Sequence, residues 1–567
     1  MTEYTGADLF VDTLEEYGVT HVFGNPGTTE LPVMEALSDS DLEYVLGLHE
    51  DVAVGAAAGY AQTRRYHADD DEDVMPVGIV NLHITPGLAH GLGNIYNADF
   101  SGVPMVVTAG NHELDFRHEE PLLDGDLEEM VSQFCKDSVE VTSIDALPML
   151  LRRAFRKALT PPTGPVFLAL PVDVMMSETD ATPERLGPIP TAGDGDTDQI
   201  AQAADYLVEA DDPVLVLGDH VARAGKDAVE AAVELAEATG ARVHGEILAG
   251  EVNFPTEHDQ WISFVGPDEG IASMLLNTDT LCLVGCSTNT TLLRHENPIV
   301  DDDTTIIQTS SDVHEVGKLH PADAAVVGDP GRVMTQLAER VNERLDEETR
   351  QARLDKVATM KAGLAGTMKS LGEDETPEGD TRSSKANLVD TMAEVAPDAY
   401  IVDEGVTSKF ALLTRFPFAP EQYVSNKGGG LGYGLPASVG AALAEGEREG
   451  EVGESRDVVC YIGDGSYLYY PHSIYTATRH DVDLTVVVSD NRNYRILKDN
   501  TLSMMGGTDD DHEYVGMDFE PAVNIPQNAE SHGARGHLVE TPDDIEAVLS
   551  EAIETEGVDV LDVLVHD

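Results

Sequence analysis

The chain has 567 residues, and its 105 Asp and Glu against 34 Lys and Arg give a formal net charge of −71. A surface this negative repels nucleic-acid phosphates and anionic lipid head groups, which excludes DNA, RNA and membranes as partners. The acid is spread along the chain and 41% of the residues are hydrophobic. The composition therefore indicates a folded protein, of roughly three or four domains at this length.

The excess of acid also predicts the setting in which the protein works. Charges of one sign repel one another in dilute buffer, but in molar salt the Debye length falls to about 3 Å and most of the repulsion is screened. We therefore expect a halophilic, cytoplasmic protein, with an ordinary acidic protein as the alternative.

No segment predicts export, membrane insertion or cross-linking. Residues 1–10 show neither the basic nor the apolar region of a secretory signal, and no apolar run is long enough to span a membrane. The four cysteines are scattered, so we expect neither a disulfide framework nor a zinc site from Cys135, Cys282, Cys286 and Cys460.

The first part of the chain alternates strand-like and helix-like segments. Apolar runs predict strands at Val77–Leu82, Val103–Ala109 and Pro165–Val172, and helices are expected at Asp51–Arg64 and Ala146–Ala158. This alternation is typical of a parallel sheet with helices on both faces.

Two further units follow after a linker at 176–197 that is rich in Pro, Gly, Thr and Asp. Strands of the second unit are expected at Val214–Leu217, Arg242–Gly245, Thr280–Gly285 and Thr305–Thr309. Residues 341–384 are polar, first helical and then loop-like. The sequence thus predicts three doubly wound parallel-sheet α/β domains, at 1–175, 198–340 and 385–567.

The most informative residues follow two strands of the third unit. Val458–Ile462 stops at Gly463-Asp464-Gly465-Ser466, and Leu484–Val488 stops at Asp490-Asn491, with a helix expected across His472–Arg479 between them. Consecutive parallel strands are often neighbours, so Asp464 and Asn491 should meet at the carboxyl edge of the sheet. Carboxylate and amide oxygens suit Mg²⁺, and the glycines let the backbone approach an anion.

A Gly-Asp-Gly triplet is a weak signal by itself, because Gly193-Asp194-Gly195 occurs in the linker as well. No predicted strand precedes that copy, and no Asn follows a second strand after it. We expect a plain turn there.

With its ordered neighbours, the Gly-Asp-Gly-Ser…Asn pattern resembles the thiamine diphosphate-binding signature. The resemblance covers almost the whole chain and rests on FGNPGTTELP (23–32), LHEDVAVGAAAGYAQ (48–62), NLHITPGLAHGLGN (81–94), GPVFLALPVDV (164–174), GGGLGYGLPASVGAALA (428–444) and GDGS…DNRNY. Among the 2-oxo acid decarboxylases and acetolactate synthases it is closest to benzoylformate decarboxylase. It implies pyrimidine-binding, central and diphosphate-binding domains, in that order.

The resemblance implies roles at the diphosphate end of the cofactor. Asp464, the Asn491 side chain and the Asn493 backbone carbonyl would bind Mg²⁺. The diphosphate would be lined by Gly465, Ser466 and Tyr494, and held from the other side by Thr407 and Ser408 in the segment DEGVTSKF.

The glycine-rich segment Asn426–Gly432 opens an Ala-rich, helix-like stretch and could be mistaken for a dinucleotide fingerprint, which is weak evidence alone. The resemblance implies instead that the Gly429 carbonyl accepts a hydrogen bond from the 4′-amino group of the pyrimidine. Leu431 would support the bent cofactor. A glycine turn that only packs a helix against a strand is the alternative.

Glu50 stands at the start of a predicted helix, where the helix dipole alone favours an acid. The resemblance assigns Glu50 to N1′ of the pyrimidine, where a carboxyl group assists removal of the proton from the thiazolium C2. Such acid–base steps supply about 10²–10⁴ in rate. In the family this Glu and the metal site come from different subunits, which implies a homodimer at least and favours a homotetramer.

Three residues are candidates for the substrate side. His83, in NLHITPG, resembles a catalytic His of the decarboxylase that acetolactate synthases lack. Thr28 occupies the place of a serine that binds the substrate carboxylate, and His295 resembles a second catalytic His if a gap is allowed. Ile496 and Asn500 replace a small and an aromatic residue, which favours an aliphatic or more polar 2-oxo acid over an aryl one.

The leading prediction is a thiamine diphosphate- and Mg²⁺-dependent decarboxylase that converts a 2-oxo acid to an aldehyde and CO₂. The alternative is a carboligase of the acetolactate synthase type, in which a second ketone takes the place of a proton. Bound FAD would favour the synthase or oxidase branch. A nicotinamide or flavin oxidoreductase and a non-enzymatic binding protein rank below both.

Overall fold

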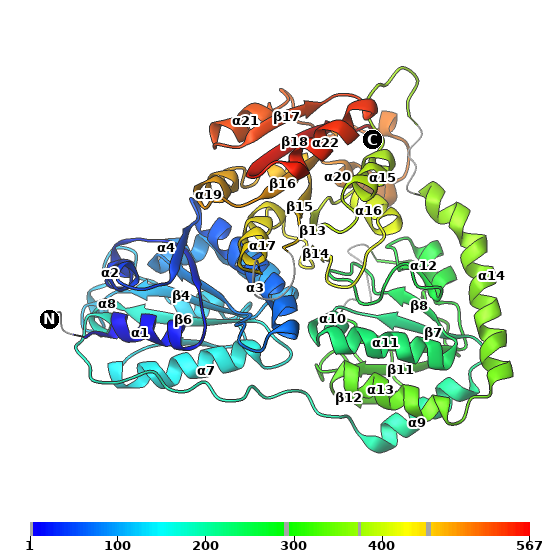
Figure 1. Cartoon of the computed structure of the whole chain (residues 1–567), viewed down its shortest axis with the longest axis horizontal. Helices are drawn as coiled ribbons and strands as arrows, with labels where there is room; N and C mark the ends of the chain where they lie inside the picture. The colour runs from blue at the N-terminus through cyan, green and yellow to red at the C-terminus, as the bar shows by residue number, and fades with distance from the viewer. Residues whose placement is uncertain (1–3, 288–293, 372–375, 449–454) are drawn as a thin grey trace.

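The computed structural model describes residues 4–287, 294–371, 376–448 and 455–567. These residues form three sheets of six parallel strands, one in each of three successive stretches of the chain (Figure 1). Helices cover both faces of each sheet, which confirms the predicted α/β class with three doubly wound sheets.

The N-terminal sheet has the strand order β2-β1-β3-β4-β6-β5. Its strands are β1 (His21–Asn25), β2 (Glu43–Leu46), β3 (Gly78–Leu82), β4 (Met105–Asn111), β5 (Ser138–Glu140) and β6 (Pro165–Pro171). One face packs against α3 (Glu50–Asp70), α4 (Ile84–His90), α5 (Leu92–Phe100) and α6 (Leu127–Val131), and the other against α1 (Gly6–Glu16), α2 (Leu31–Ser38), α7 (Leu147–Leu159) and α8 (Val172–Met175). The strands are apolar throughout because successive side chains alternate between two buried faces: Val80 packs on the α3 side and Ile79 on the α1 side.

The central sheet has the order β12-β11-β10-β7-β8-β9. Its strands are β7 (Pro213–Leu217), β8 (Arg242–Gly245), β9 (Trp261–Phe264), β10 (Thr280–Val284), β11 (Thr305–Ser310) and β12 (Ala324–Val327). One face packs against α9 (Thr197–Glu209), α11 (Lys226–Thr239) and α13 (Pro330–Asn342), and the other against α12 (Glu269–Leu276). The short helix α10 (His220–Arg223) follows β7, and the long helix α14 (Glu347–Leu371) runs along the outside (Figure 1).

The C-terminal sheet has the order β14-β13-β15-β16-β18-β17. Its strands are β13 (Tyr400–Glu404), β14 (Tyr423–Ser425), β15 (Val458–Gly463), β16 (Leu484–Asp490), β17 (Arg535–Val539) and β18 (Val558–Leu564). One face packs against α17 (Gly434–Arg448), α19 (Ser473–Arg479) and α21 (Ile525–Ser531), and the other against α15 (Lys385–Val395), α16 (Lys409–Arg415) and α22 (Ile545–Glu554). The short helix α18 (Asp464–Tyr467) follows β15, and α20 (Arg495–Met505) follows β16.

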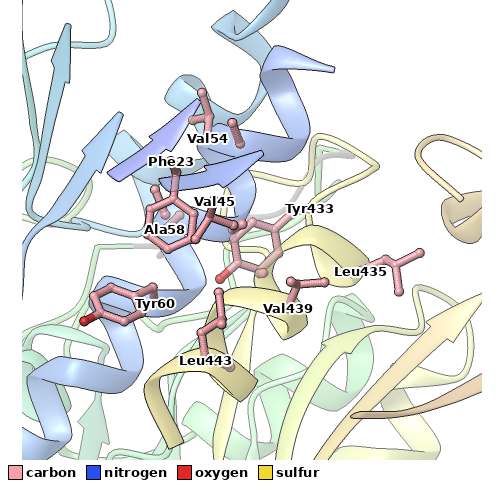
Figure 2. Close-up of a cluster of buried hydrophobic side chains, with 14 of the residues drawn as sticks. Phe23, Val45, Val54, Ala58, Tyr60, Tyr433, Leu435, Val439 and Leu443 are labelled. Atoms are coloured by element: carbon pink, nitrogen blue, oxygen red, sulfur yellow. The ribbon is translucent and has the colours of Figure 1, made fainter. Parts of the chain in front are cut away.

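The N-terminal and C-terminal units share one hydrophobic core, built where α3 crosses α17. Figure 2 shows Phe23, Val45 and Val54 from the first unit and Tyr433 and Val439 from the last within this one core. The helices approach so closely that a Cβ on Gly440 would lie 1.8 Å from the carbonyl oxygen of Ala56. The two units that were predicted to hold the cofactor are therefore joined directly within one chain.

The strands and helices named from the sequence agree with the structure to within a few residues, except at two places. Gly463 is the last residue of β15 and Asp464-Gly465-Ser466 begin α18, and the helix expected from Asp51 extends from Glu50 to Asp70. The predicted linker is the segment that leads from α8 to α9 along the edge of the molecule (Figure 1). Across the described residues, no helix is both long enough and apolar enough to cross a bilayer.

Candidate active site

The carboxyl edge of the C-terminal sheet gathers the candidate metal ligands. β15 and β16 pair in parallel with Gly463 opposite Ser489, so Asp464 and Asn491 follow neighbouring strands at the same edge. Both are buried, with 4% of Asp464 and 8% of Asn491 exposed. The structure therefore brings the two predicted ligands into one region.

Two acids that the sequence analysis did not select as candidate ligands lie at the same edge. Asp490 ends β16 and Asp562 lies on β18, and both are buried. Burial and the neighbouring Asp490 raise the pKa of Asp464 to about 9 and that of Asp562 to about 8. Carboxyl groups this close cannot all ionise unless a cation compensates their charge.

Three buried oxygens at this edge have no hydrogen-bond donor among the residues that the structure describes. They are Asp464 Oδ2, Asn493 Oδ1 and Asp562 Oδ1. Leaving a buried acceptor unsatisfied costs about 1–3 kcal/mol. Carboxylate and amide oxygens of this kind are the ligands that a hard divalent cation such as Mg²⁺ prefers, and binding one would remove that cost for the oxygen concerned.

The predicted diphosphate-lining residues adjoin this edge. Gly465 lies under the ring of Tyr494, where a Cβ would be 2.6 Å from Tyr494 Cε1, and Ser466 follows in α18 with 3% exposure. Asn493 Nδ2 donates to the Asn491 carbonyl at 2.8 Å, which holds the loop after β16 together. Only glycine fits at position 465 because a side chain would displace Tyr494.

Thr407 and Ser408 lie on the other side of β15. They follow β13, which pairs with β15 along the edge opposite β16. Ser408 Oγ donates to the Gly405 carbonyl at 2.9 Å, so its proton is used within the turn, while Thr407 is half-buried. Their contact with a diphosphate stays a prediction, and Ser408 would have to release Gly405 to donate to it.

The glycine-rich turn Asn426–Gly432 precedes α17 and packs against α5 of the N-terminal unit. Asn97 Nδ2 donates to the Gly430 carbonyl at 2.9 Å, and Asn97 Oδ1 accepts the Gly430 amide at 3.1 Å. Gly429 has φ of +74°, a conformation that favours glycine, and it is exposed, while Leu431 is half-buried. The cofactor contacts of Gly429 and Leu431 stay predictions.

Glu404 is a buried acid that the sequence analysis missed. Its carboxylate accepts the amides of Gly432 at 2.9 Å and Gly434 at 2.8 Å, at the N-terminus of α17. Burial raises the pKa of Glu404 to about 7, although these hydrogen bonds oppose the shift. Glu404 was visible within DEGVTSKF, but no sequence signal indicates that its side chain turns back to cap α17.

Glu50 begins α3, and its Oε2 lies 3.1 Å from His90 Nδ1. Gly87 on α4 separates Glu50 from His83: a Cβ at Gly87 would lie 3.2 Å from Glu50 Oε1 and 3.0 Å from His83 Cβ. The structure thus brings the predicted acid–base residue and the predicted catalytic histidine into one small region, because both lie at the carboxyl side of the N-terminal sheet.

His49, Glu50 and His90 offer possible metal-ligand atoms within 4.8 Å of one another. His49 caps α3, since its Nδ1 accepts the Asp51 amide at 3.1 Å. A neutral ring with Nδ1 as acceptor carries its proton on Nε2, so a metal at Nε2 would have to displace that proton. We assign no metal to this group.

A buried carboxylate holds His83. Glu30 Oε2 lies 2.9 Å from His83 Nδ1, and Glu30 Oε1 accepts the Gly110 amide at 2.9 Å. With Nδ1 engaged, Nε2 is the nitrogen that can exchange a proton with a substrate. Sequence analysis overlooked Glu30 within FGNPGTTELP and selected Thr28, which is exposed at the start of the same short helix.

His295 lies in the central unit, with Nε2 2.9 Å from the Pro267 carbonyl. The preceding Gly266 faces Phe410 of α16, so this region adjoins the helix that follows Thr407 and Ser408. The catalytic role of His295 stays a prediction. Ile496 and Asn500 lie on α20, directly after Tyr494, and Ile496 is exposed.

Comparison with known proteins accounts for all three units. Family profiles of the thiamine pyrophosphate enzymes match residues 4–135 as the N-terminal TPP binding domain, 200–337 as the central domain and 405–563 as the C-terminal TPP binding domain. The chain belongs to the thiamine diphosphate-dependent enzymes.

Relatives of this thiamine diphosphate enzyme include both decarboxylases and synthases. Benzoylformate decarboxylase of Pseudomonas aeruginosa is 28% identical over 96% of this chain and 95% of its own. The large subunit of acetolactate synthase isozyme 3 of Escherichia coli is 27% identical over 98% of this chain and 93% of its own. The solved thiamine diphosphate-dependent 4-hydroxybenzoylformate decarboxylase of Rhodococcus jostii superposes with a TM-score of 0.83 at 26% identity, covering 99% of each chain.

Proposed function

We propose that this thiamine diphosphate enzyme is a Mg²⁺-dependent, benzoylformate decarboxylase-like lyase that converts a 2-oxo acid to an aldehyde and CO₂. The observation that carries the proposal is the pair of His83 and Glu30, which stands beside Glu50 across Gly87. An aldehyde forms only when a proton reaches the reacting carbon. A histidine held through Nδ1 by a buried carboxylate is suited to deliver it.

The residues at the C-terminal sheet edge would hold the cofactor. The Asp464 and Asn491 side chains and the Asn493 carbonyl would coordinate Mg²⁺, with Gly465, Ser466, Tyr494, Thr407 and Ser408 around the diphosphate and with Gly429 and Leu431 at the pyrimidine. When bound, thiamine diphosphate supplies the electron sink that a 2-oxo acid needs to lose CO₂.

Glu50 would hold a proton at N1′ of the pyrimidine. Only 14% of its side chain is exposed, so the carboxyl group is largely withdrawn from water. General acid–base catalysis by a positioned carboxyl contributes about 10²–10⁴ in rate. Within one chain, the C-terminal unit reaches this helix start through Tyr470, which donates to Asp51 Oδ2 at 2.9 Å. In the family that the chain resembles, this Glu and the metal site come from different subunits, so we infer that Glu50 serves the metal site of a second copy, in a homodimer at least.

The substrate side would be formed by His83, Thr28 and His295, with Thr28 offering its exposed hydroxyl to the substrate carboxylate. Ile496 adds an exposed aliphatic side chain next to the cofactor residue Tyr494, and Asn500 adds an amide one turn later. These two side chains favour an aliphatic or more polar 2-oxo acid.

Carboligation of the acetolactate synthase type is the second candidate, and the identity to the Escherichia coli large subunit favours it. In that reaction the carbon must stay unprotonated until a second ketone arrives. A proton donor that is positioned like His83 would protonate the carbon before the second ketone arrives. Decarboxylation therefore ranks first.

The test is a panel of aliphatic, polar and aryl 2-oxo acids in molar KCl with thiamine diphosphate and Mg²⁺, following CO₂ and the organic product. The proposal expects one aldehyde for each CO₂. A ligated hydroxy-oxo acid as the main product would contradict it and establish the synthase reaction.

The variant His83→Ala separates the two reactions. We expect aldehyde formation to fall by about 10²–10⁴, because an acid–base group is lost, while cofactor binding is retained. Part of the substrate should be diverted to carboligation when an acceptor aldehyde is supplied. His314→Ala, at an exposed histidine of the central unit, is the matched control. Wild-type aldehyde formation by His83→Ala would remove His83 from the mechanism.

A further inference from the structure

Lys427 is a buried cation within the glycine-rich turn. Its Nζ lies 2.8 Å from Asp219 Oδ2 and 2.6 Å from Glu246 Oε1. The side chain of Lys427 is 2% exposed and those of both acids are 0% exposed. Buried ion pairs from Lys427 to Asp219 and Glu246, called the ion triad below, therefore join the turn that was predicted to contact the pyrimidine to the central unit.

The triad occupies the carboxyl edge of the central sheet. Asp219 follows β7 and Glu246 follows β8, and these strands are neighbours. In a doubly wound sheet, this edge is where ligands usually bind, next to the point where the strand order reverses. In the central sheet the strand order reverses beside β7, which has β8 on one side and β10 on the other. The ammonium group of Lys427, from the C-terminal unit, lies at this edge.

Both acids are built to receive a cation at a fixed position. Asp219 accepts the Gly250 amide at 3.0 Å and Asn253 Nδ2 at 3.2 Å, and Glu246 Oε1 accepts the Asp219 amide at 2.9 Å. Burial opposes the charge of Lys427, but the two carboxylates outweigh it and raise the pKa of Lys427. The ammonium group is thus held by partners that cannot move without breaking backbone contacts of the central unit.

The chain just before the turn is joined to the same place. Ser425 donates its amide to the Gly250 carbonyl at 2.9 Å, and Glu251 forms an antiparallel bridge with Val424 of β14. Glu251 also accepts from Tyr66 of α3 at 2.9 Å. Three units meet within a few residues of Gly429.

We propose that Lys427 is a positioning residue for the cofactor, through which the central unit sets where the Asn426–Gly432 turn meets the pyrimidine. Asn97 of the N-terminal unit holds the turn at Gly430, and acids of the central unit hold it at Lys427. The position of Gly429, between these two residues, is therefore restrained from both sides. Holding a reacting group in place matters because a displacement of about 1 Å can cost about 10² in rate. This inference rests on the proposed cofactor role of the turn.

The test compares variants of the full-length protein in molar KCl. Lys427→Met alone removes the cation that two buried carboxylates share and should destabilise the fold strongly. The triple variant Lys427→Met, Asp219→Asn, Glu246→Gln removes the charge from all three groups at similar volume, and Lys427→Arg keeps the charge while moving it. Cofactor affinity is measured by calorimetry with Mg²⁺, and kcat and KM are measured at saturating cofactor.

We expect the triple variant and Lys427→Arg to bind thiamine diphosphate at least about tenfold more weakly. At saturating cofactor, kcat should fall by about tenfold or more while KM for the 2-oxo acid stays within about twofold, because the turn meets the cofactor and not the substrate. If Lys427 only stabilised the fold, the folded variants would keep the cofactor affinity, kcat and KM of the unaltered protein. Arg242→Met is the matched control, since Arg242 pairs with Asp212 at 2.6 Å at the opposite end of β8 and should lower the melting temperature without changing affinity.

Wild-type cofactor affinity and kcat in either folded variant would overturn the role of Lys427. Failure of the unaltered protein to bind thiamine diphosphate would instead overturn the proposed function, so the two failures are distinguishable.

Discussion

Asp464 and Asp194 occupy the same local sequence but different environments. Each stands in a Gly-Asp-Gly triplet, but Asp464 is 4% exposed beside further buried acids, whereas the side chain of Asp194 is 72% exposed and pairs with Arg332 at 2.9 Å. A surface pair of that kind contributes little free energy. Only the first copy lies among buried carboxyl groups that cannot all ionise unless a divalent cation compensates their charge.

We therefore expect Asp464→Ala to abolish Mg²⁺-dependent binding of thiamine diphosphate, with an affinity loss above about 100-fold, because the site loses a buried ionisable oxygen. Titration calorimetry at high salt measures the loss. Asp194→Ala is the control within the second triplet and should bind as the unaltered protein does. Unchanged affinity for Asp464→Ala would move the metal away from this edge.

At the scale of elements, the crossing of α3 and α17 positions the candidate site. Gly59 and Gly440 face carbonyl oxygens of the opposite helix, where a Cβ would lie 2.0 Å and 1.8 Å away. The small residues let the helices approach until their apolar side chains interdigitate in the core of Figure 2. The same approach places the glycine-rich turn, which leads into α17, against Asn97.

Gly440→Leu should therefore destabilise the chain by about 3 kcal/mol or more, because the two helices must move apart. Gly446→Ala is the control on the same helix. No atom lies within 4 Å of its Cβ position, so this change should stabilise α17 by about 0.5–1 kcal/mol. Denaturant midpoints in molar KCl measure both. An equal effect of the two substitutions would show that the crossing does not depend on close approach.

The far end of the same crossing is held by two acids of α17. Glu447 pairs with His21 at 2.8 Å and with Arg64 at 2.8 Å, and Glu445 pairs with Arg456 and His67. Burial would raise the pKa of both acids, but their hydrogen bonds and cationic partners prevail and lower it to about 2.

Because folding lowers these pKa values, the stabilisation is complete above the unfolded pKa of about 4.5 and is lost as pH falls toward 2. We expect up to about 3 kcal/mol per acid to disappear over that window. The double variant Glu445→Gln, Glu447→Gln should be less stable at neutral pH and should lose most of this pH dependence. Unfolding free energies measured from pH 6 to pH 2 at constant high salt provide the test, and parallel curves for the two proteins would refute it.

At the scale of the whole molecule, the net charge of −71 opposes compaction. Some cations are engaged in bridges between units, such as Lys427 with Glu246 and Arg65 with Glu251, and the 34 Lys and Arg cannot neutralise the 105 Asp and Glu. The acidic surface depends on dissolved ions for screening.

We expect loss of tertiary structure, and dissociation of the proposed homodimer, below a few hundred millimolar salt, where the Debye length exceeds about 5 Å. Near-UV circular dichroism and sedimentation across a KCl series measure the two effects. Parallel titration with NaCl and KCl separates general screening from specific cation binding. A melting temperature that stays constant between low and molar KCl would contradict a halophilic adaptation.

The sequence by itself determined the fold class and much of the candidate site, because both depend on local patterns. Apolar runs that alternate with helical stretches require parallel sheets covered on both faces, and residues directly after β-strands must fall at the carboxyl edge. Asp464 and Asn491 could therefore be placed together before any coordinates, and Glu50 could be placed at a helix start.

Only the tertiary structure decided what surrounds those residues. Glu30 turns toward His83, Glu404 turns back to cap α17, and Lys427 reaches into the central sheet across contacts between segments far apart in the chain. Their roles depend on side-chain direction, burial and the loss of solvent, and none of these leaves a periodic signal in the sequence. A buried acid and an exposed acid look alike until the fold removes the water from one of them.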